Sequence, residues 1–405
     1  MNLLIINHNA GRPDLGYMFR PYYLAREWVR LGHSTTVIGS TYSHVRKGIT
    51  IPGEESYDGI KYLWIKSRKY KGNGFARIIA MIQFITKIWC RAKSISERFR
   101  PDVVIASSTY PLDIYPARRI AKYSGAKLCF ELHDLWPLSP IELGGYSKRH
   151  PFIKVMQVAE DFYCKHADKV ISIIPLAKDY LVGRGLDGRK YFNVPNGIAM
   201  EEWNVDEPLL PELEDKINKI KSKFDFSIAY AGAHGIANAL DSLLLAAEKL
   251  SNKNVGIVLI GGGPERERLF NEPQNMGLNN VFFIETVPKN QIPALLTKFD
   301  ALYIGLQKES LFRFGISPNK IFDYMMAGRP IIQAIDAGNN LVAEANCGIY
   351  AEAENADAIA RAIRELKSMS PDQRQKLGQN GKEYVLKNHT YSVLAKKFLE
   401  AIQQD

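Results

Sequence analysis

Short apolar segments alternate with helix-like amphipathic stretches along almost the whole chain, and this alternation constrains the fold more than any other feature. Apolar runs bounded by turn residues are typical of buried strands. The segments predicted to form strands are 3–7, 34–38, 103–106, 127–132, 170–174, 190–194, 227–230, 255–260, 281–284, 301–305 and 330–334. Because continuous apolar strands joined by helices form parallel sheets covered on both faces, the pattern predicts an α/β fold with doubly wound sheets.

The length of the chain predicts more than one domain. Its 405 residues exceed what one hydrophobic core usually serves, since cores stop growing near ~250–300 residues. The break is expected after the turn at 195–198, where a polar, acidic stretch, 201–223, precedes the next strands. We therefore predict two doubly wound domains, 1–198 and 199–390. Open α/β sheets bind ligands at the carboxyl ends of their strands, so we expect both domains to face a cleft.

The net charge of +10 is concentrated in one segment. From Lys66 to Arg100, ten lysines and arginines stand against one acid, Glu97. Apolar residues with helical spacing lie among them: Ile78, Met81, Ile82, Ile85, Ile88 and Trp89. A basic amphipathic helix suits an anionic membrane surface, although the same pattern fits a core helix with a solvated basic side. No RNA-binding aromatic motif, zinc knuckle or recognition helix accompanies the charge, which argues against a nucleic-acid partner.

Cysteine usage and hydropathy predict a cytoplasmic protein. The cysteines are far apart and have no metal-type spacing, which favours reduced thiols: Cys90, Cys129, Cys164 and Cys347. The N-terminus has no positively charged region followed by a cleavage site. No segment approaches the ~18–20 apolar residues that a membrane-spanning helix needs. We therefore expect a protein that is neither exported nor integral to a membrane.

The segment 317–332 is predicted to form a loop, a capped helix and a buried strand in succession. Ser317 is predicted to cap the helix, with Pro318 in its first position and Gly328 at its end. A helix N-terminus favours anions such as phosphate. Lys320 and Asp323 would share one face, so a cation could meet a diphosphate while a carboxylate holds two ribose hydroxyls. An ordinary surface Lys–Asp pair explains the spacing equally well.

Other candidate residues follow predicted strands. His133 comes directly after the strand 127–132, between Glu131 and Asp134, at a position where cleft residues are found. Glycines that let backbone approach a ligand occur in two loops, and plain turns would also explain them: Gly11 and Gly16 after the first strand, and Gly232 and Gly235 after the strand 227–230. Three further glycines, 261–263, open another predicted helix.

These segments occur in a specific order: 3–7, 22–38, 131–137, 194–198, 228–232, 261–265, 287–289 and 317–332. Together they resemble the retaining GT-B glycosyltransferases of family 4 (group 1), in particular the branch that builds bacterial surface polysaccharides and O-antigens and includes the L-fucosamine transferases. The resemblance covers nearly the whole chain. It implies two Rossmann-like domains, 1–198 for the acceptor and 199–390 for the nucleotide sugar. A C-terminal helix, within 391–405, would cross back to the first domain.

The resemblance also implies roles for particular residues. His133 would lie beside the anomeric centre of the donor sugar, with Glu131 and Asp134 as nearby carboxylates. The residues expected to bind the donor are Gly11, Gly16, Gly232, Gly235, Glu309, Arg313, Ser317, Asn319, Lys320 and Asp323. The sequence lacks the first of the family's two glutamates, whose place Gly315 takes, and Glu309 could replace it. It also lacks the frequent basic residue after Gly232, so phosphate binding is expected to shift to Lys320 and Arg313.

The leading hypothesis is transfer, with retention, of an N-acetylated amino or deoxyamino sugar such as N-acetyl-fucosamine. The donor would be a UDP-sugar and the acceptor a saccharide linked to undecaprenyl diphosphate, at the inner face of the cell membrane. No cofactor is expected, and no Asp-x-Asp metal site is present in the sequence. Two alternatives remain open: a UDP-sugar 2-epimerase of the same fold, and a non-catalytic nucleotide-binding subunit. A nicotinamide-dependent oxidoreductase is disfavoured because residues 261–263 lack the G-x-G-x-x-G register.

Overall fold

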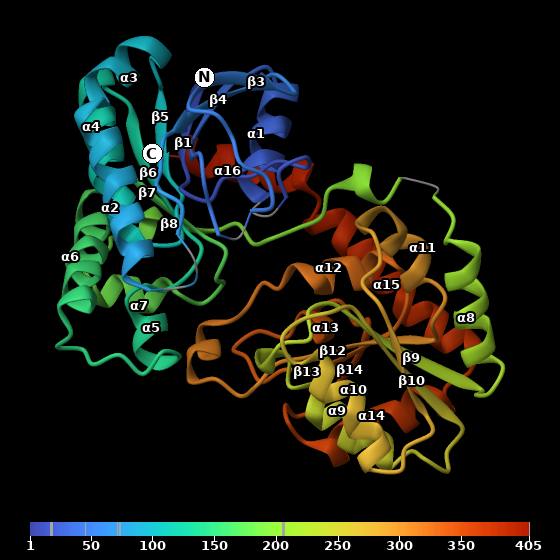
Figure 1. The fold of residues 1–405 in the computed structure, drawn as a ribbon. Coiled ribbons are helices and arrows are strands. Elements are labelled where there is room, and N and C mark those ends of the chain that lie inside the picture. The colour runs from blue at the N-terminus through green and yellow to red at the C-terminus, as the bar shows by residue number, and fades with distance from the viewer. Residues whose placement is uncertain (17–18, 45, 71, 73, 205–206, 405) are drawn as a thin grey trace. The chain divides into compact units, whose positions relative to one another are not determined.

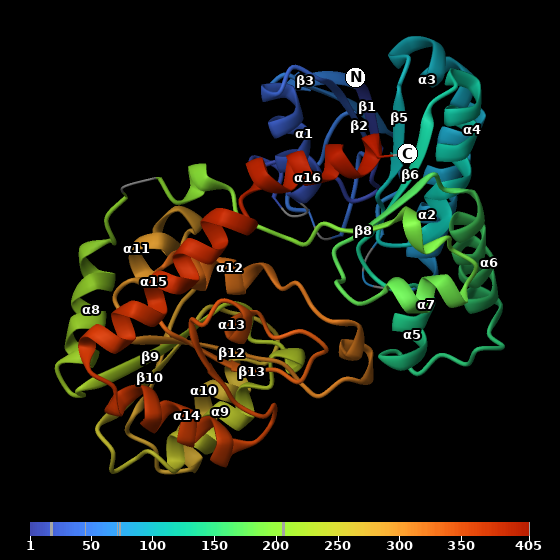
Figure 2. The ribbon, with the colours of Figure 1, turned by 180° about the vertical axis from the view of Figure 1, so that it is seen from behind.

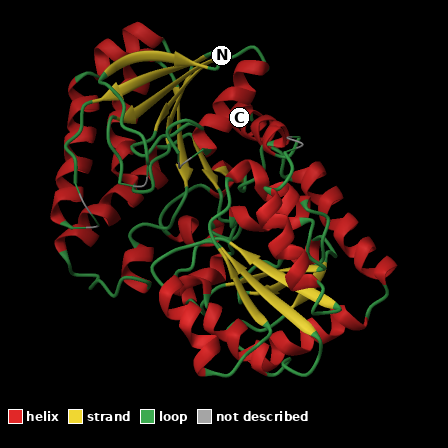
Figure 3. Cartoon of the chain, turned by 45° about the vertical axis from the view of Figure 1, so that its right-hand side comes forward, coloured by secondary structure: helices red, strands yellow, loops and turns green. Residues whose placement is uncertain are grey.

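The computed structural model describes residues 1–16, 19–44, 46–70, 72, 74–204 and 207–404. These residues form two compact units. Unit 1 comprises Met1–Asn196 and Tyr391–Asp405, and unit 2 comprises Gly197–Thr390. Each unit has its own set of strands with helices around it (Figure 3). Every predicted strand is present, with bounds that agree or shift by one or two residues.

Unit 1 is built on one sheet with the strand order β3-β4-β2-β1-β5-β6-β7-β8. All neighbouring strands are parallel except β3 and β4. The strands are β1 (Asn2–Ile6), β2 (Ser34–Ser40), β3 (Gly53–Tyr57), β4 (Ile60–Ile65), β5 (Val103–Ala106), β6 (Lys127–Leu132), β7 (Lys169–Ser172) and β8 (Tyr191–Asn193). The central strands β1 and β5 are almost entirely buried, as expected for a sheet with helices on both faces.

The hairpin β3–β4 was not predicted. Strand β3 is almost wholly exposed, so it carries none of the apolar signal on which the prediction relied. Its turn is Asp58-Gly59, with φ values of 51° and 75°. An Asp-Gly pair is a strong hairpin signal because both central residues of a type I′ turn need positive φ. The turn residues could therefore have indicated this hairpin.

The helices of unit 1 are α1 (Arg20–Arg30), α2 (Phe75–Cys90), α3 (Ala92–Phe99), α4 (Ile114–Ser124), α5 (Leu138–Glu142), α6 (Pro151–His166), α7 (Lys178–Gly183) and α16 (Tyr391–Gln403). The last helix of the chain, α16, lies alongside α1 in opposite views (Figures 1 and 2). The indole of Trp28 donates to the carbonyl of Ala395 at 3.1 Å and meets the ring of Phe398 edge-on. This buried contact ties the C-terminal helix to the start of the chain.

Helix α2 forms the middle of the basic, amphipathic segment 66–100. One face is buried against the unit: Ala80, Met81, Phe84 and Ile88. The opposite side carries a second apolar stripe, in which Phe75, Ile82 and Trp89 are 75%, 53% and 40% exposed. The helix is thus a core helix, as one of the two sequence interpretations has it, and it carries an additional exposed apolar stripe. Lys71 of the basic segment lies outside the described residues.

Unit 2 is built on a parallel sheet with the strand order β11-β10-β9-β12-β13-β14. Its strands are β9 (Phe226–Ala231), β10 (Val255–Ile260), β11 (Val281–Ile284), β12 (Ala301–Gly305), β13 (Ile331–Ala334) and β14 (Gly348–Tyr350). Its helices are α8 (Pro211–Lys221), α9 (Leu240–Glu248), α10 (Arg266–Asn275), α11 (Ile292–Leu296), α12 (Asn319–Met326), α13 (Leu341–Glu344), α14 (Ala356–Ser368) and α15 (Pro371–Asn388).

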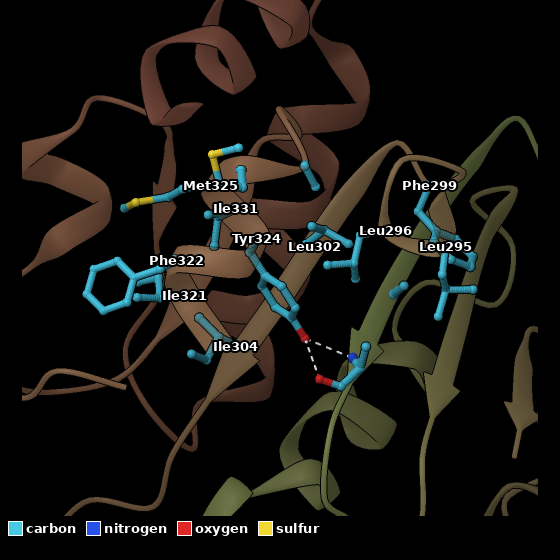
Figure 4. Packing of buried hydrophobic residues seen from close by; sticks show 14 of the residues in the cluster. Leu295, Leu296, Phe299, Leu302, Ile304, Ile321, Phe322, Tyr324, Met325 and Ile331 are labelled. Carbon is cyan, nitrogen blue, oxygen red and sulfur yellow. Dashed lines mark hydrogen bonds between the residues drawn. The ribbon is translucent and has the colours of Figure 1, made fainter. Parts of the chain in front are cut away.

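Helix α12 is anchored to the central strand β9 by one side chain. The Tyr324 hydroxyl donates to the carbonyl of Ala231 at 3.1 Å and accepts from its N–H at 2.8 Å (Figure 4). Its ring packs among apolar residues of the same core, including Ile321 and Ile304. Because Ala231 is the last residue of β9, this contact fixes α12 beside the loop that follows the strand.

Candidate functional site

A cavity of about 440 Å³ opens in unit 2 where β9 and β10 end. This is the edge at which parallel sheets bind ligands, and the volume lies within the usual range of small-molecule sites. Its lining residues are Ala231, Gly232, Ala233, Ile260, Gly261, Gly262, Thr286, Val287, Ile292, Leu296, Lys320, Asp323 and Tyr324. Three residues predicted to bind a donor, Gly232, Lys320 and Asp323, therefore meet in one cavity.

Lys320 is the cation of this cavity. Its ammonium donates to the Tyr230 hydroxyl at 2.8 Å and to Asn238 Oδ1 at 3.3 Å, and it lies 4.1 Å from the centre of the Tyr230 ring. Among the described residues no carboxylate lies within 4.0 Å of it. Burial lowers the pKa of Lys320 to about 7. A buried ammonium without a counter-ion is stabilised by an anionic ligand, so this residue is suited to bind phosphate.

The glycines of two loops are required for close backbone approach. The loop after β9 pairs with the loop after β10: Gly232 N–H donates to Ile260 O at 2.9 Å, and His234 N–H donates to Gly262 O at 2.7 Å. A Cβ on Gly261 would lie 2.1 Å from the carbonyl oxygen of Gly232. A side chain at residue 261 would therefore break this pairing, which shapes one wall of the cavity.

Asp323 presents a carboxyl group to the same cavity. Its Oδ1 accepts from the indole N–H of Trp203 at 3.1 Å. In the described part of the chain its Oδ2 has no further hydrogen-bond partner. Burial raises the pKa of Asp323 to about 6, with the Trp203 bond acting in the opposite direction. One oxygen is thus held by the protein, and the other can accept from a ligand hydroxyl.

The start of α12 differs from the prediction. The helix begins at Asn319, and its N-cap is Pro318, which has no side-chain acceptor. Pro318 has φ −73° and ψ 128°, which is extended, so helical geometry starts one residue later than predicted. The prediction that Ser317 caps the helix is therefore wrong. Ser317 and Asn319 flank the N-cap and do not line the cavity.

The remaining predicted donor-binding residues of unit 2 lie elsewhere. Arg313 donates to Ser310 O at 2.6 Å and stacks over the Phe314 ring at 4.3 Å, within the short turn Ser310–Phe314. Glu309 precedes that turn and accepts from Phe312 N–H through its backbone carbonyl. These two residues and Gly235 are not among those that line the cavity.

His133 belongs to a separate buried cluster in unit 1. Its Nε2 lies 3.0 Å from Ser107 Oγ and 3.1 Å from Glu131 Oε2. Glu131 pairs with Arg20 at 2.8 Å and accepts from Ser107 Oγ at 2.6 Å. Arg20 also donates to the carbonyls of Val194 and Pro195. We place the ring proton of His133 on Nε2, because Nε2 can then donate to the Glu131 carboxylate. Nδ1 is left as an acceptor.

The carboxylates beside His133 are held by the protein. Burial alone would raise the pKa of Glu131, but the Arg20 guanidinium and His133 hold that pKa well below its ordinary value. Glu131 is only 2% exposed, so it is suited to position the His133 ring. Asp134 accepts from Leu135 N–H at 2.8 Å, from Trp136 Nε1 at 3.0 Å and from the Ser139 hydroxyl. Its carboxylate therefore organises the loop after β6.

The glycines of the first loop also lie in unit 1. Gly11 is buried in the loop after β1, and Gly16 has φ 70°, a conformation that favours glycine. Between them Arg12 forms ion pairs with Asp14 at 2.8 Å and Glu55 at 2.7 Å. These contacts give the loop a fixed shape within unit 1.

Several contact residues of both clusters were not predicted. Ser107 directly follows β5, so its place at the carboxyl end of a strand could have indicated it. Tyr230 ends the predicted strand 227–230 and could have been indicated in the same way. Arg20, Trp203 and Asn238 carry no local signal, because each is defined by a partner far along the chain.

Metal-binding clusters and membrane-spanning helices are both absent from the described residues. No group of three or more His, Cys, Asp or Glu side chains there could hold a metal ion. No helix among those residues is long and apolar enough to cross a bilayer.

Comparisons with known proteins agree with this architecture. Residues 17–197 match the glycosyl transferase 4-like domain, and residues 213–384 match the glycosyl transferases group 1 family. An Escherichia coli protein assigned to colanic acid biosynthesis, the glycosyl transferase WcaI, is 22% identical over 279 residues, which are 66% of this chain and 67% of that protein.

Similar solved structures cover nearly the whole chain. Sucrose-phosphate synthase from Thermosynechococcus elongatus has a TM-score of 0.73 at 14% identity, covering 99% of this chain and 98% of its own. Anabaena HepE in complex with UDP and glucose has a TM-score of 0.67 at 14% identity, covering 100% of both chains. The Escherichia coli trehalose-6-phosphate enzyme bound with UDP-2-fluoro glucose has a TM-score of 0.72 at 14% identity, covering 100% and 99%. With two Rossmann-like units and family matches across both, the chain is a glycosyltransferase of the group 1 family with the GT-B fold.

Proposed function

We propose that this enzyme transfers an N-acetylated amino or deoxyamino sugar, such as N-acetyl-fucosamine, from a UDP-sugar to a lipid-linked saccharide, with retention of the anomeric configuration. The observation that carries the proposal is the unit 2 cavity, where Lys320 and Asp323 meet beside a glycine-lined wall. The similar HepE and trehalose-6-phosphate structures contain UDP or a UDP-sugar, which supports a uridine donor.

Lys320 is suited to the leaving diphosphate. Negative charge develops on that group as the glycosidic bond breaks, and a fixed cation in a partly buried site stabilises it strongly. The Tyr230 hydroxyl and Asn238 Oδ1 position the ammonium without neutralising it. The chain thus supplies its own positive group at this point.

Asp323 is suited to the ribose. A carboxylate accepts from two vicinal hydroxyls, and the Trp203 indole holds this one in place through Oδ1. Lys320 and Asp323 are three residues apart on α12, so the phosphate and ribose contacts would lie about one helical turn apart.

His133 is proposed to contact the donor sugar through its Nδ1. The buried Glu131 orients the ring by accepting from Nε2, and Arg20 keeps that carboxylate ionised. A neutral imidazole with a free Nδ1 can accept from a sugar hydroxyl close to the reacting carbon. This assignment makes His133 a catalytic residue and Glu131 a positioning residue.

Unit 1 is proposed to receive the acceptor at an anionic membrane surface, on the cytoplasmic side. The exposed stripe of α2, Phe75, Ile82 and Trp89, repeats every seven residues and so follows one side of the helix. Such a stripe with basic residues on the same segment suits the interface of an anionic bilayer. A surface polysaccharide or O-antigen acceptor carried on undecaprenyl diphosphate is in line with the likeness to WcaI.

The test is a transfer assay with a panel of UDP-N-acetylamino sugars and a lipid-linked acceptor extract, read out as UDP release and as product by mass spectrometry. We expect Lys320→Ala to raise the donor KM at least tenfold, and His133→Ala to lower kcat while UDP binding persists. NMR of the product reports the anomeric configuration. Parental rates for both variants would refute the site assignment. Conversion of the donor sugar without any acceptor would indicate an epimerase instead.

A further inference from the structure

A separate cavity of about 390 Å³ lies in unit 1, beside the hairpin β3–β4 and the C-terminal end of α2. Its lining residues are Pro52, Gly53, Leu63, Trp64, Lys66, Lys87 and Arg91. Three of them are cations, and no acid is among them.

The three cations have no acidic partner in the described part of the chain. Among the described residues, no carboxylate lies within 4.0 Å of Lys66, Lys87 or Arg91. The nearby acid Glu54 on β3 is already paired with Arg98 through both of its oxygens. The charge of this cavity is therefore uncompensated within the described part of unit 1.

The fold places the positive charges of this cavity close to one another. Lys87 and Arg91 are four residues apart at the end of α2, a spacing at which like charges repel. The Lys87 ammonium is fixed by donating to the backbone carbonyl of Lys66 at 2.6 Å. Lys66 follows β4, so its own side chain reaches the cavity from a different element. An anion in the cavity would remove the repulsion.

The dipole of helix α2 explains part of this clustering of cations. Cations near a helix C-terminus are favourable, which accounts for Lys87 and Arg91 individually. It does not account for Lys66, nor for a cavity between these groups. The lining also includes the apolar residue Leu63, which could contact a carbon skeleton attached to the anion.

We propose that this cavity binds a phosphate-bearing anion, held by Lys66, Lys87 and Arg91, with Leu63 against its organic part. The volume is large enough for a phosphate with a glycerol- or sugar-sized group attached. Ile51, next in sequence to Pro52, is 85% exposed and supplies apolar surface at this end of the hairpin. The same chemistry belongs to a phospholipid head group and to a soluble phosphorylated compound.

The test compares the parental enzyme with Lys66→Gln/Lys87→Gln/Arg91→Gln and with the control Lys93→Gln. Lys93 is a 72% exposed cation two residues from Arg91 that does not line the cavity. One arm titrates inorganic pyrophosphate and takes its affinity for this cavity from the hydrogen exchange of residues 53–65, because calorimetry alone would also register binding at Lys320. The other arm sediments phosphatidylcholine vesicles with and without phosphatidylglycerol. Circular dichroism and the urea midpoint establish that each variant is folded.

We expect the parental enzyme and Lys93→Gln to behave alike in both arms. The triple variant should lose at least tenfold in affinity for one probe and lose protection of residues 53–65. Loss confined to pyrophosphate identifies a soluble phosphorylated ligand, and loss confined to the phosphatidylglycerol vesicles identifies a lipid head group. Unchanged binding of both probes by a folded triple variant overturns the proposal. Because Lys320 and His133 are intact in every variant, UDP binding reports on the proposed donor site separately.

Discussion

The side chain of Lys320 occupies the space that any side chain on residue 232 would need. A Cβ added to Gly232 would lie 2.6 Å from Lys320 Cε and 2.7 Å from its Nζ. Real Cβ atoms do not approach so closely, and the far end of a lysine can move aside. The glycine thus fixes where the cation sits. Because its φ of 159° is one that other residues rarely adopt, a side chain there should affect both ligand binding and folding.

Gly232→Ala is expected to weaken UDP binding about tenfold, because it displaces the Lys320 ammonium from Tyr230 and Asn238. The measurement is the UDP Kd by calorimetry together with the melting temperature. Gly235→Ala is the matched control in the same loop, since its nearest neighbour would be Asn238 Nδ2 at 3.8 Å and its φ is −121°. Equal UDP affinities for the two alanine variants would contradict this role of Gly232.

UDP binding is expected to weaken as the pH rises above about 7, the lowered pKa of Lys320. The protonated lysine is the form that binds a diphosphate, so above that pH the free enzyme must take up a proton on binding. Affinity should then fall by up to about tenfold per pH unit. Calorimetry in buffers of different ionisation enthalpy measures the proton uptake. Uridine, which has no phosphate, should show no such fall, and Lys320→Ala should abolish it.

UDP affinity is also expected to fall on the acidic side of its pH profile, below about pH 6, where Asp323 takes up a proton. We call this fall the acidic limb. Trp203→Phe removes the indole that lowers this pKa, so the limb should move to higher pH while the limb set by Lys320 stays in place. UDP Kd values between pH 5 and 8 test the shift. An unchanged acidic limb in Trp203→Phe would sink the assignment of Asp323 to this limb.

Asp323→Asn is expected to raise the stability of the protein at pH 7.5 while it weakens UDP binding. The pKa of the carboxyl group is raised in the folded state, so its ionised form destabilises the fold above about pH 6 and has no such effect below its ordinary pKa. The neutral amide should therefore stabilise the protein at pH 7.5 by up to about 2–3 kcal/mol, at 1.36 kcal/mol per pKa unit, and should not at pH 4. Urea unfolding at both pH values measures this, and UDP affinity should fall at pH 7.5.

Glu131→Gln is expected to destabilise unit 1 by about 3–5 kcal/mol at pH 7, because it leaves the buried Arg20 guanidinium without its counter-ion. The Glu131 pKa is held below its ordinary value, so the stabilisation is present above that value and is lost as the pH falls into the acid range. His133→Ala should lose less stability and more turnover. Urea unfolding and kcat for the two variants distinguish the positioning residue from the catalytic one.

The local sequence determined the strands, because a buried strand is a short run whose apolar character is visible residue by residue. It also placed Lys320 and Asp323 on one helix, since their spacing is a property of the helix alone. The start of that helix was predicted one residue early, because only the backbone angles of Pro318 decide where helical geometry begins.

The tertiary structure decided which side chains meet. Lys320 and Tyr230 are 90 residues apart, Trp203 and Asp323 are 120 apart, and Arg20 and Glu131 are 111 apart. Periodicity carries no information over such separations, because these contacts depend on sheet order and on how each helix is set against its strand. The sequence alone therefore determined the α/β class and the candidate helix, whereas the folded units decided that Gly232, Lys320 and Asp323 share a cavity and that Arg313 and Glu309 lie outside it.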